Sequence, residues 1–125
     1  MNAIAPPEAD RWLLNALAAV FKLRELAADW DGGGSPPVRE EALAGAVRLL
    51  CALPSEELPP PHVCPVSGRG IQLEWQLSGR ELELEVLPDG SVEFLKVDGD
   101  WMDEGALGRD DLLHARALAD WLRQA

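Results

Sequence analysis

The stretch DWDGGGSPP at residues 29–37 holds two carboxylates, a serine and three consecutive glycines, which are residue types found in many active-site loops. Its serine lacks the G-x-S-x-G frame that exposes a hydrolase nucleophile. Its glycines lack the strand–glycine–helix context of a dinucleotide site. We therefore interpret the stretch as a structural loop between two helices, in which Asp31 accepts hydrogen bonds from backbone amides, as Asx residues do. The residues assigned to this loop are Trp30, Asp31, Gly32, Gly34 and Pro37.

Two cysteines and two histidines could in principle hold a zinc ion: Cys51, His62, Cys64 and His114. Their spacing contains neither CxxC nor HxxxH, so we predict structural roles for them and assign no metal site, no catalytic residue and no cofactor. A thiol nucleophile would need a nearby base. The pairs Cys64–His114 and Cys51–His62 both stay open, because the spacing selects neither.

Acidic residues dominate residues 71–104, with ten Asp or Glu against two Arg or Lys. In the predicted strand register, Glu74 lies opposite Glu83, and Glu85 lies opposite Glu93. Like charges placed directly opposite each other cost a few tenths to about 1 kcal/mol per pair. General acid–base catalysis would need one of these carboxyls to be buried, and alternation predicts that they are solvated. The face is therefore a docking site for a cationic partner, a divalent cation site or an ordinary solvated surface.

A tryptophan–methionine pair, Trp101 and Met102, follows in a predicted acidic loop at residues 98–105. An exposed pair of this kind would anchor a protein interface. The alternative is that Trp101 caps the open end of the sheet. The candidate partner-binding residues are Glu74, Glu81, Glu83, Glu85, Glu93 and Trp101.

The 125 residues predict one domain over positions 1–125, with 1–8 as a loose lead-in. A net charge of −11 argues against direct binding to nucleic acid or to anionic membranes and permits a basic protein partner. The sequence has no secretory signal pattern and no apolar run long enough to span a membrane. With only two cysteines, we expect a cytoplasmic protein with reduced thiols. The oligomeric state stays open.

Apolar residues at helical spacing predict three helices. The first covers about residues 10–28, with Trp30 completing its apolar stripe, and the second covers residues 38–53. The third starts at Asp110 or Asp111 and runs to about residue 123. Its candidates for burial are Leu113, Ala117, Leu118, Trp121 and Leu122.

Between the second and third helices the period changes from 3.6 to 2, which predicts a three-stranded antiparallel meander over residues 70–97. A two-residue Ser78–Gly79 loop sets Trp75 opposite Leu82. A three-residue loop at residues 88–90, in which Gly90 adopts a left-handed conformation, sets the register between the second and third strands of the meander. Residues 61–66 could add a short edge strand, because their prolines suit an edge. Lys96 falls near the end of the apolar face and is expected to extend into solvent.

The predicted fold class is α+β, with two N-terminal helices, a three- to four-stranded antiparallel meander, one C-terminal helix, and the helices on one sheet face. The apolar face of the predicted sheet consists of Ile71, Leu73, Trp75, Leu82, Leu84, Val86, Val92 and Phe94. The opposite face consists of Gln72, Glu74, Gln76, Glu81, Glu83, Glu85, Glu93 and Leu95.

Several short motifs together resemble a family of small, uncharacterised bacterial proteins. They are W-D-G-x-G-x-x-P, followed after a helix by G-[IV]-x-L-E-W, L-E-[IL]-E and D-G. The matched positions cover about half the chain and are Trp30, Asp31, Gly32, Gly34, Pro37, Gly70, Ile71, Leu73, Glu74, Trp75, Leu82, Glu83, Glu85, Asp89 and Gly90. The resemblance implies a bacterial origin and supplies no reaction. It places Glu74, Glu83 and Glu85 in the shared block.

Together these patterns predict a small, acidic, non-catalytic interaction protein of the antitoxin, immunity or accessory-subunit type. Its glutamate-rich sheet face would dock a basic protein. One alternative is a metal-dependent hydrolase that uses Asp31 and the sheet carboxylates. Another is a nucleic-acid mimic, in which carboxylates imitate the spacing of phosphates.

Overall fold

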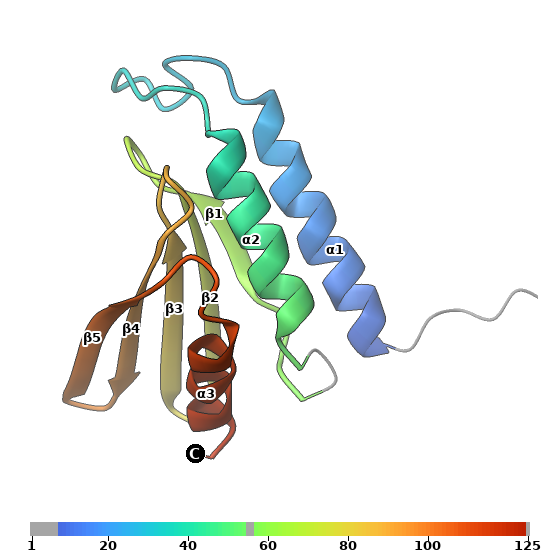
Figure 1. The fold of residues 1–125 in the computed structure, drawn as a ribbon, viewed down its shortest axis with the longest axis vertical. Helices are drawn as coiled ribbons and strands as arrows, with labels where there is room; N and C mark the ends of the chain where they lie inside the picture. Colours follow the sequence, from blue (N-terminus) through green and yellow to red (C-terminus); the bar gives the residue numbers. More distant parts are fainter. Residues whose placement is uncertain (1–7, 55–56, 125) are drawn as a thin grey trace, which may run out of the picture.

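Three helices lie on one side of a five-stranded antiparallel sheet in the computed structural model, which describes residues 8–54 and 57–124 (Figure 1). The predicted α+β class is confirmed, although the sheet has five strands rather than three or four. Strand order follows chain order, so each strand pairs with its neighbours in sequence. The elements are α1 (Glu8–Lys22), a short 3₁₀ turn (Leu23–Glu25), α2 (Glu40–Ala52), β1 (His62–Pro65), β2 (Ile71–Leu77), β3 (Arg80–Val86), β4 (Val92–Asp98), β5 (Trp101–Leu107) and α3 (Leu112–Arg123).

The first predicted hairpin register is confirmed. Trp75 pairs with Leu82 across β2 and β3. The connecting residues Ser78 and Gly79 have φ values of 52° and 84°. Two positive φ values are what a two-residue type I′ turn requires, and this turn matches the twist of the flanking strands.

The second register is confirmed as well, with Val86 opposite Val92. The amide of Leu87 donates to the carbonyl of Ser91 at 2.8 Å, which closes the predicted three-residue loop. Gly90 has the predicted left-handed φ, at 88°. The predicted edge strand is β1, which pairs with β2.

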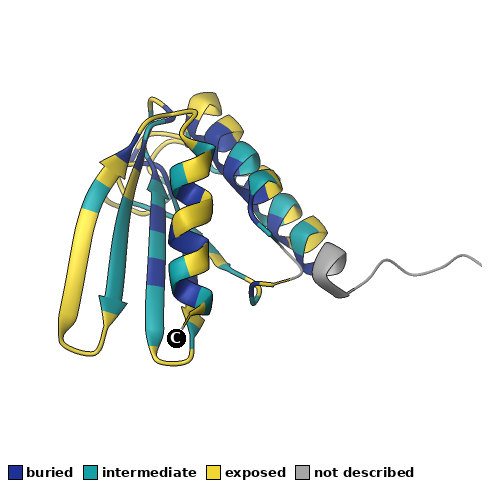
Figure 2. Ribbon diagram, turned by 60° about the horizontal axis from the view of Figure 1, so that its bottom comes forward, coloured by how far each residue is buried: buried dark blue, intermediate teal, exposed yellow. Residues whose placement is uncertain are grey.

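A fifth strand occupies the place where the sequence predicts an acidic loop. Gly99, with φ of 62°, and Asp100 form a two-residue turn that pairs Asp98 with Trp101. β5 then runs beside β4 as an edge strand, and most of its residues are exposed (Figure 2). The prediction is wrong because an edge strand that buries few side chains has no alternation of apolar and polar residues to reveal it.

The first helix is shorter than predicted. α1 ends at Lys22, and after the 3₁₀ turn the backbone becomes extended at Leu26, with φ of −72° and ψ of 120°. Ala27 is exposed, and Trp30 lies in the following turn, where its indole N–H donates to the Pro36 carbonyl at 3.0 Å. Trp30 therefore does not complete the apolar stripe, because the helix has already ended.

α3 begins as predicted, with Asp111 as N-cap accepting from the amide of His114 at 3.2 Å. Two of its predicted core residues are wrong, since Leu113 is 81% exposed and Ala117 is also exposed. The buried residues of α3 are Ala115, Leu118, Ala119 and Leu122. They follow the i, i+3, i+4, i+7 spacing of one helix face, and small alanines let the helix approach the sheet.

The core lies between the sheet and the helices (Figure 2). α2 and α3 pack on the central strands β2 and β3, while α1 packs on α2 and β1. The predicted apolar face is buried except for Phe94, which is half-buried. No helix of the described chain is long and apolar enough to cross a bilayer.

Lys96 lies opposite Leu82, as predicted, but its ammonium group does not extend into solvent. The side chain is only 17% exposed. Its Nζ lies 5.5 Å from the centre of the Trp101 ring, 5.3 Å from that of Trp121 and 3.5 Å from Asp103 Oδ2. Cation–π attraction and the ion pair keep the ammonium at this aromatic edge of the helix layer.

Candidate functional site

The sheet face opposite the helices is not covered by any described element, and we call it the open sheet face. Side chains alternate along each strand, so the pairing of the strands decides which residues share it. The predicted glutamates Glu74, Glu81, Glu83, Glu85 and Glu93 all lie on it. Its other members on β2, β4 and β5 are Gln72, Gln76, Leu95, Val97, Met102, Glu104 and Ala106.

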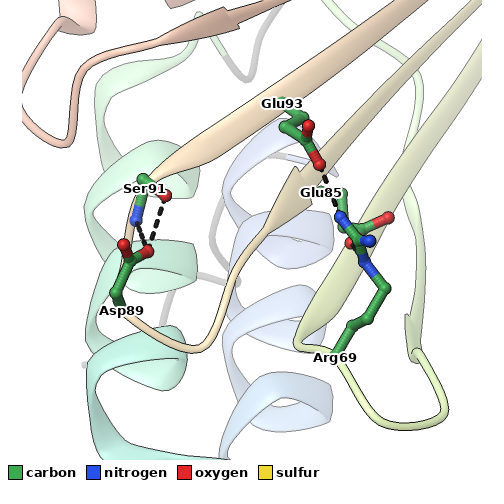
Figure 3. A network of polar contacts seen from close by, with 5 residues as sticks. All are labelled: Arg69, Glu85, Asp89, Ser91 and Glu93. Atoms are coloured by element: carbon green, nitrogen blue, oxygen red, sulfur yellow. Dashed lines mark hydrogen bonds and ion pairs between the residues drawn. The ribbon is translucent and has the colours of Figure 1, made fainter.

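One of the two predicted like-charge pairs is bridged by a cation. Glu85 lies opposite Glu93, and the guanidinium of Arg69 donates to both carboxylates (Figure 3). The Arg69 to Glu93 distance is 2.5 Å. The bond to Glu85 and then its charge raise the pKa of Arg69, so the guanidinium stays charged. Arg69 precedes β2 in a loop, and alternation within the strands could not reveal that it reaches this face.

The other like-charge pair has no such bridge. Glu74 lies opposite Glu83, and Glu81 is two residues from Glu83 on the same face. Among the described residues, no salt bridge joins any of these three carboxylates to a cation. We call Glu74, Glu81 and Glu83 the glutamate cluster.

Glu83 is the most perturbed member of the glutamate cluster. Partial burial raises its pKa, and the neighbouring charges of Glu74, Glu81 and Glu85 raise it further. Two amides donate to the other two members of the cluster: Gln72 Nε2 to Glu74 at 3.5 Å, and Gln76 Nε2 to Glu81 at 3.2 Å. These neutral donors do not offset the charge. The cluster is therefore a patch of negative potential on an exposed sheet face.

An apolar strip lies beside the acidic residues, and the sequence prediction missed most of it. Leu95 and Val97 on β4 are half-buried, while Met102 on β5 is 62% exposed. A hollow of about 510 Å³ lies between the two kinds of residue. It is lined by Glu83, Glu85, Glu93, Phe94, Leu95, Glu104, Gly105 and Ala106. The two-residue turn between Asp98 and Trp101 is the signal that the sequence offered. A strand that continues from this turn and pairs with β4 would have placed Met102 and Glu104 on the open sheet face.

Trp101, which we also predicted to bind the partner, does not lie on the open sheet face with the glutamates. It pairs with Asp98 on the helix side of the sheet. Its ring centre lies 6.0 Å from that of Trp121 on α3, although the residue remains 49% exposed. Met102, its neighbour, points to the opposite side, so the two residues do not form one anchor. The interpretation that Trp101 covers an open end of the sheet fits these contacts better.

The loop at residues 29–37 is held by internal hydrogen bonds. Asp31 accepts from Ser35 Oγ at 2.5 Å, from the Gly33 amide at 2.9 Å and from the Ser35 amide at 3.2 Å. The Ser35 hydroxyl, which is buried, accepts from the Gly68 amide at 2.9 Å. The Ser35 bond, followed by the Gly33 bond, lowers the pKa of Asp31 well below its usual range. These are the amide bonds predicted for Asp31, and they tie the loop to the β1–β2 connection.

The two cysteines lie on different elements, and so do the two histidines. Cys51 is exposed on α2, whereas His62 and Cys64 lie on β1. His114 on α3 contacts the Phe94 ring at a centroid distance of 5.4 Å. Burial, followed by the charges of Glu74 and Glu83, raises the pKa of the Cys64 thiol, which disfavours the thiolate needed for nucleophilic attack. The described residues contain no group of three His, Cys, Asp or Glu that could hold a metal ion.

Comparison of the chain with protein-family models, with curated proteins and with solved structures found no match. The fold and the open sheet face are therefore the basis for assigning a function.

Proposed function

We propose that this protein is a small, non-catalytic interaction protein of the antitoxin, immunity or accessory-subunit type, which docks a basic protein through the open sheet face. The glutamate cluster carries the proposal. Three carboxylates stand together on an uncovered face, and within the described chain no cation offsets them. Their mutual repulsion is relieved when a cationic partner binds.

The chemistry of the rest of the face supports docking. Protein interfaces combine exposed apolar side chains with polar surroundings, and methionine is enriched in them. Met102, Leu95 and Val97 supply the apolar part, and the glutamates supply charge that steers a basic partner during encounter. The nearby Arg69 offsets one of the two negative charges of Glu85 and Glu93, whereas the three charges of the glutamate cluster have no such partner among the described residues.

A hydrolase built on Asp31 has less support. Both carboxylate oxygens of Asp31 accept hydrogen bonds from Gly33 or Ser35 in its own loop. That use of the oxygens is the one expected of a turn-stabilising aspartate. We place the protein in the cytoplasm, where the free thiols of Cys51 and Cys64 would remain reduced.

The experiment is a double charge reversal, Glu81→Lys with Glu83→Lys, in a tagged chain expressed in a bacterial host that carries its partner. Glu85 is left unchanged, because its reversal would also release Arg69. Mass spectrometry should identify a basic protein that co-purifies with the wild type, and the reversal should abolish this co-purification. The matched control, Glu25→Lys with Glu41→Lys, changes exposed residues on the helix layer by the same total charge. Equal partner recovery with both double variants would contradict the proposal.

A further inference from the structure

The two edge strands of the sheet, β1 and β5, differ in their capacity to form backbone hydrogen bonds with an additional strand. β1 has four residues and ends in Pro65, which has no amide hydrogen to donate. β5 has seven residues and no proline. An edge strand directs every second N–H and C=O away from its neighbour. Among the described residues, no other backbone segment hydrogen-bonds to the backbone of β5 beyond β4.

The side chains on the two faces of β5 differ in chemistry. On the open sheet face, Glu104 lies opposite Leu95, and no described cation pairs with it. On the helix side, Trp101 is 49% exposed, and Gly105 lies beneath the Phe94 ring. A Cβ atom placed on Gly105 would lie 2.9 Å from that ring, so the ring covers the strand where a side chain is missing. The carboxylate of β5 without a described cation partner, Glu104, therefore lies on the open sheet face, whereas Asp103 on the helix side is paired with Lys96 beside Trp101.

We propose that β5 is a strand-addition site for an extended segment of the partner in which Lys or Arg alternates with apolar residues. This inference rests on the proposed function and specifies how the basic partner is held. The backbone of β5 would supply the hydrogen bonds, as in other complexes that extend a sheet. Basic side chains of the segment would lie beside Glu104 on the open sheet face. Its apolar side chains would lie beside Trp101 and the Phe94 ring.

Charge favours a basic segment over a second copy of the chain. Antiparallel pairing of two β5 strands would bring their Glu104 side chains close together, and like charges across a pair are destabilising. Each copy also carries a net charge of −11. Asp103 is partly balanced by Lys96 at 3.5 Å, but Glu104 is not. The same acidic residues that oppose self-pairing would attract a basic strand.

The probe is a capped seven-residue peptide of alternating Lys and Val, titrated into the ¹⁵N-labelled protein. A second peptide of the same composition, with D residues at irregular positions, keeps the charge but disrupts the regular strand that pairing with β5 requires. Hydrogen exchange followed by NMR should show new protection at alternate amides of β5 with the all-L peptide only. Equal binding of the two peptides, or protection in β1 instead, would overturn the inference. Protection of these amides in the free protein, together with a concentration-dependent dimer, would assign the edge to a second copy.

A charge reversal at the edge provides the second measurement. Glu104→Lys should weaken binding of the all-L peptide by roughly tenfold, because one attraction becomes a repulsion. Glu25→Lys, an equal change on the helix layer, should leave the dissociation constant within about twofold. Equal weakening by both variants would show that the peptide responds only to total charge, and would overturn the inference.

The experiments distinguish failure of the strand-addition inference from failure of the proposed function. If the peptide does not add to β5 but the reversal of Glu81 and Glu83 still abolishes partner recovery, the inference is wrong and the proposed function stands. If the peptide adds to β5 while that reversal leaves partner recovery unchanged, the glutamate cluster is not the docking site.

Discussion

At the scale of one residue, Glu83 shows that the charges of the open sheet face lower the stability of the fold. Its carboxylate lies opposite Glu74 and close to Glu81, and the half-buried position limits its solvation. The raised pKa means that folding disfavours its charged form. The charge is therefore present despite a stability cost, which is the pattern expected where binding rather than folding uses it.

Glu83→Gln should raise the free energy of unfolding at neutral pH by about 0.5 kcal/mol, because it removes the like-charge repulsion with Glu74. The cost of the wild-type charge is fully present above the folded-state pKa and vanishes below the unfolded value of 4.5. The gain should therefore disappear as the pH falls below 4.5. Urea unfolding of the wild type and the variant at several pH values measures this difference.

Glu93→Gln is the matched control for the Glu83 measurement. Glu93 is paired with Arg69, so its neutralisation removes an attraction and should not stabilise the fold. A gain of the same size from both variants would mean that lowering net charge, and not local repulsion, explains the effect.

At the scale of elements, the strands with two distinct faces were predictable and the edge strand was not. β2 and β3 alternate apolar residues with glutamate or glutamine, and their turns carry residues that tolerate positive φ, so their register follows from the sequence. β5 buries little, and its pairing depends on the turn at Gly99. The glutamates of the open sheet face were predictable for the same reason as the register. Arg69 was not, because it reaches the face from a loop.

α3 shows the same limit for helices. The period suggested Leu113 and Ala117 as core residues, but two adjacent stripes of α3 carry apolar residues. The sheet selects the stripe that contains Ala115 and Ala119, because small residues permit close packing of the helix on β3. Only the three-dimensional arrangement distinguishes the two stripes.

Leu122→Ala should therefore lower the free energy of unfolding by about 2–5 kcal/mol, since it opens a cavity in the core. Leu122 is fully buried, whereas Leu113 is 81% exposed. Leu113→Ala should change stability by less than about 0.5 kcal/mol. Denaturant titration of both variants checks this contrast. A large loss from Leu113→Ala together with a small loss from Leu122→Ala would contradict the observed orientation of α3.

At the scale of the whole molecule, the two sides of the sheet differ in composition and in their contribution to the fold. The helix side holds the core, and its aromatic end encloses Lys96 between Trp101 and Trp121. The open side holds the glutamate cluster, the Arg69 bridge and the apolar strip. A surface that contributes little to the core can change its charge without loss of the fold, which suits a face that recognises a partner.

Methyl NMR of the labelled protein with its purified partner tests most directly whether the open sheet face is the docking surface. Leu95, Val97 and Met102 place methyl groups on that face, while the exposed Leu14 and Leu113 report on the helix layer. Binding should shift or broaden the signals of Leu95, Val97 and Met102 and leave those of Leu14 and Leu113 unchanged. Shifts confined to Leu14 and Leu113 would place the partner on the helices and contradict the proposed docking face.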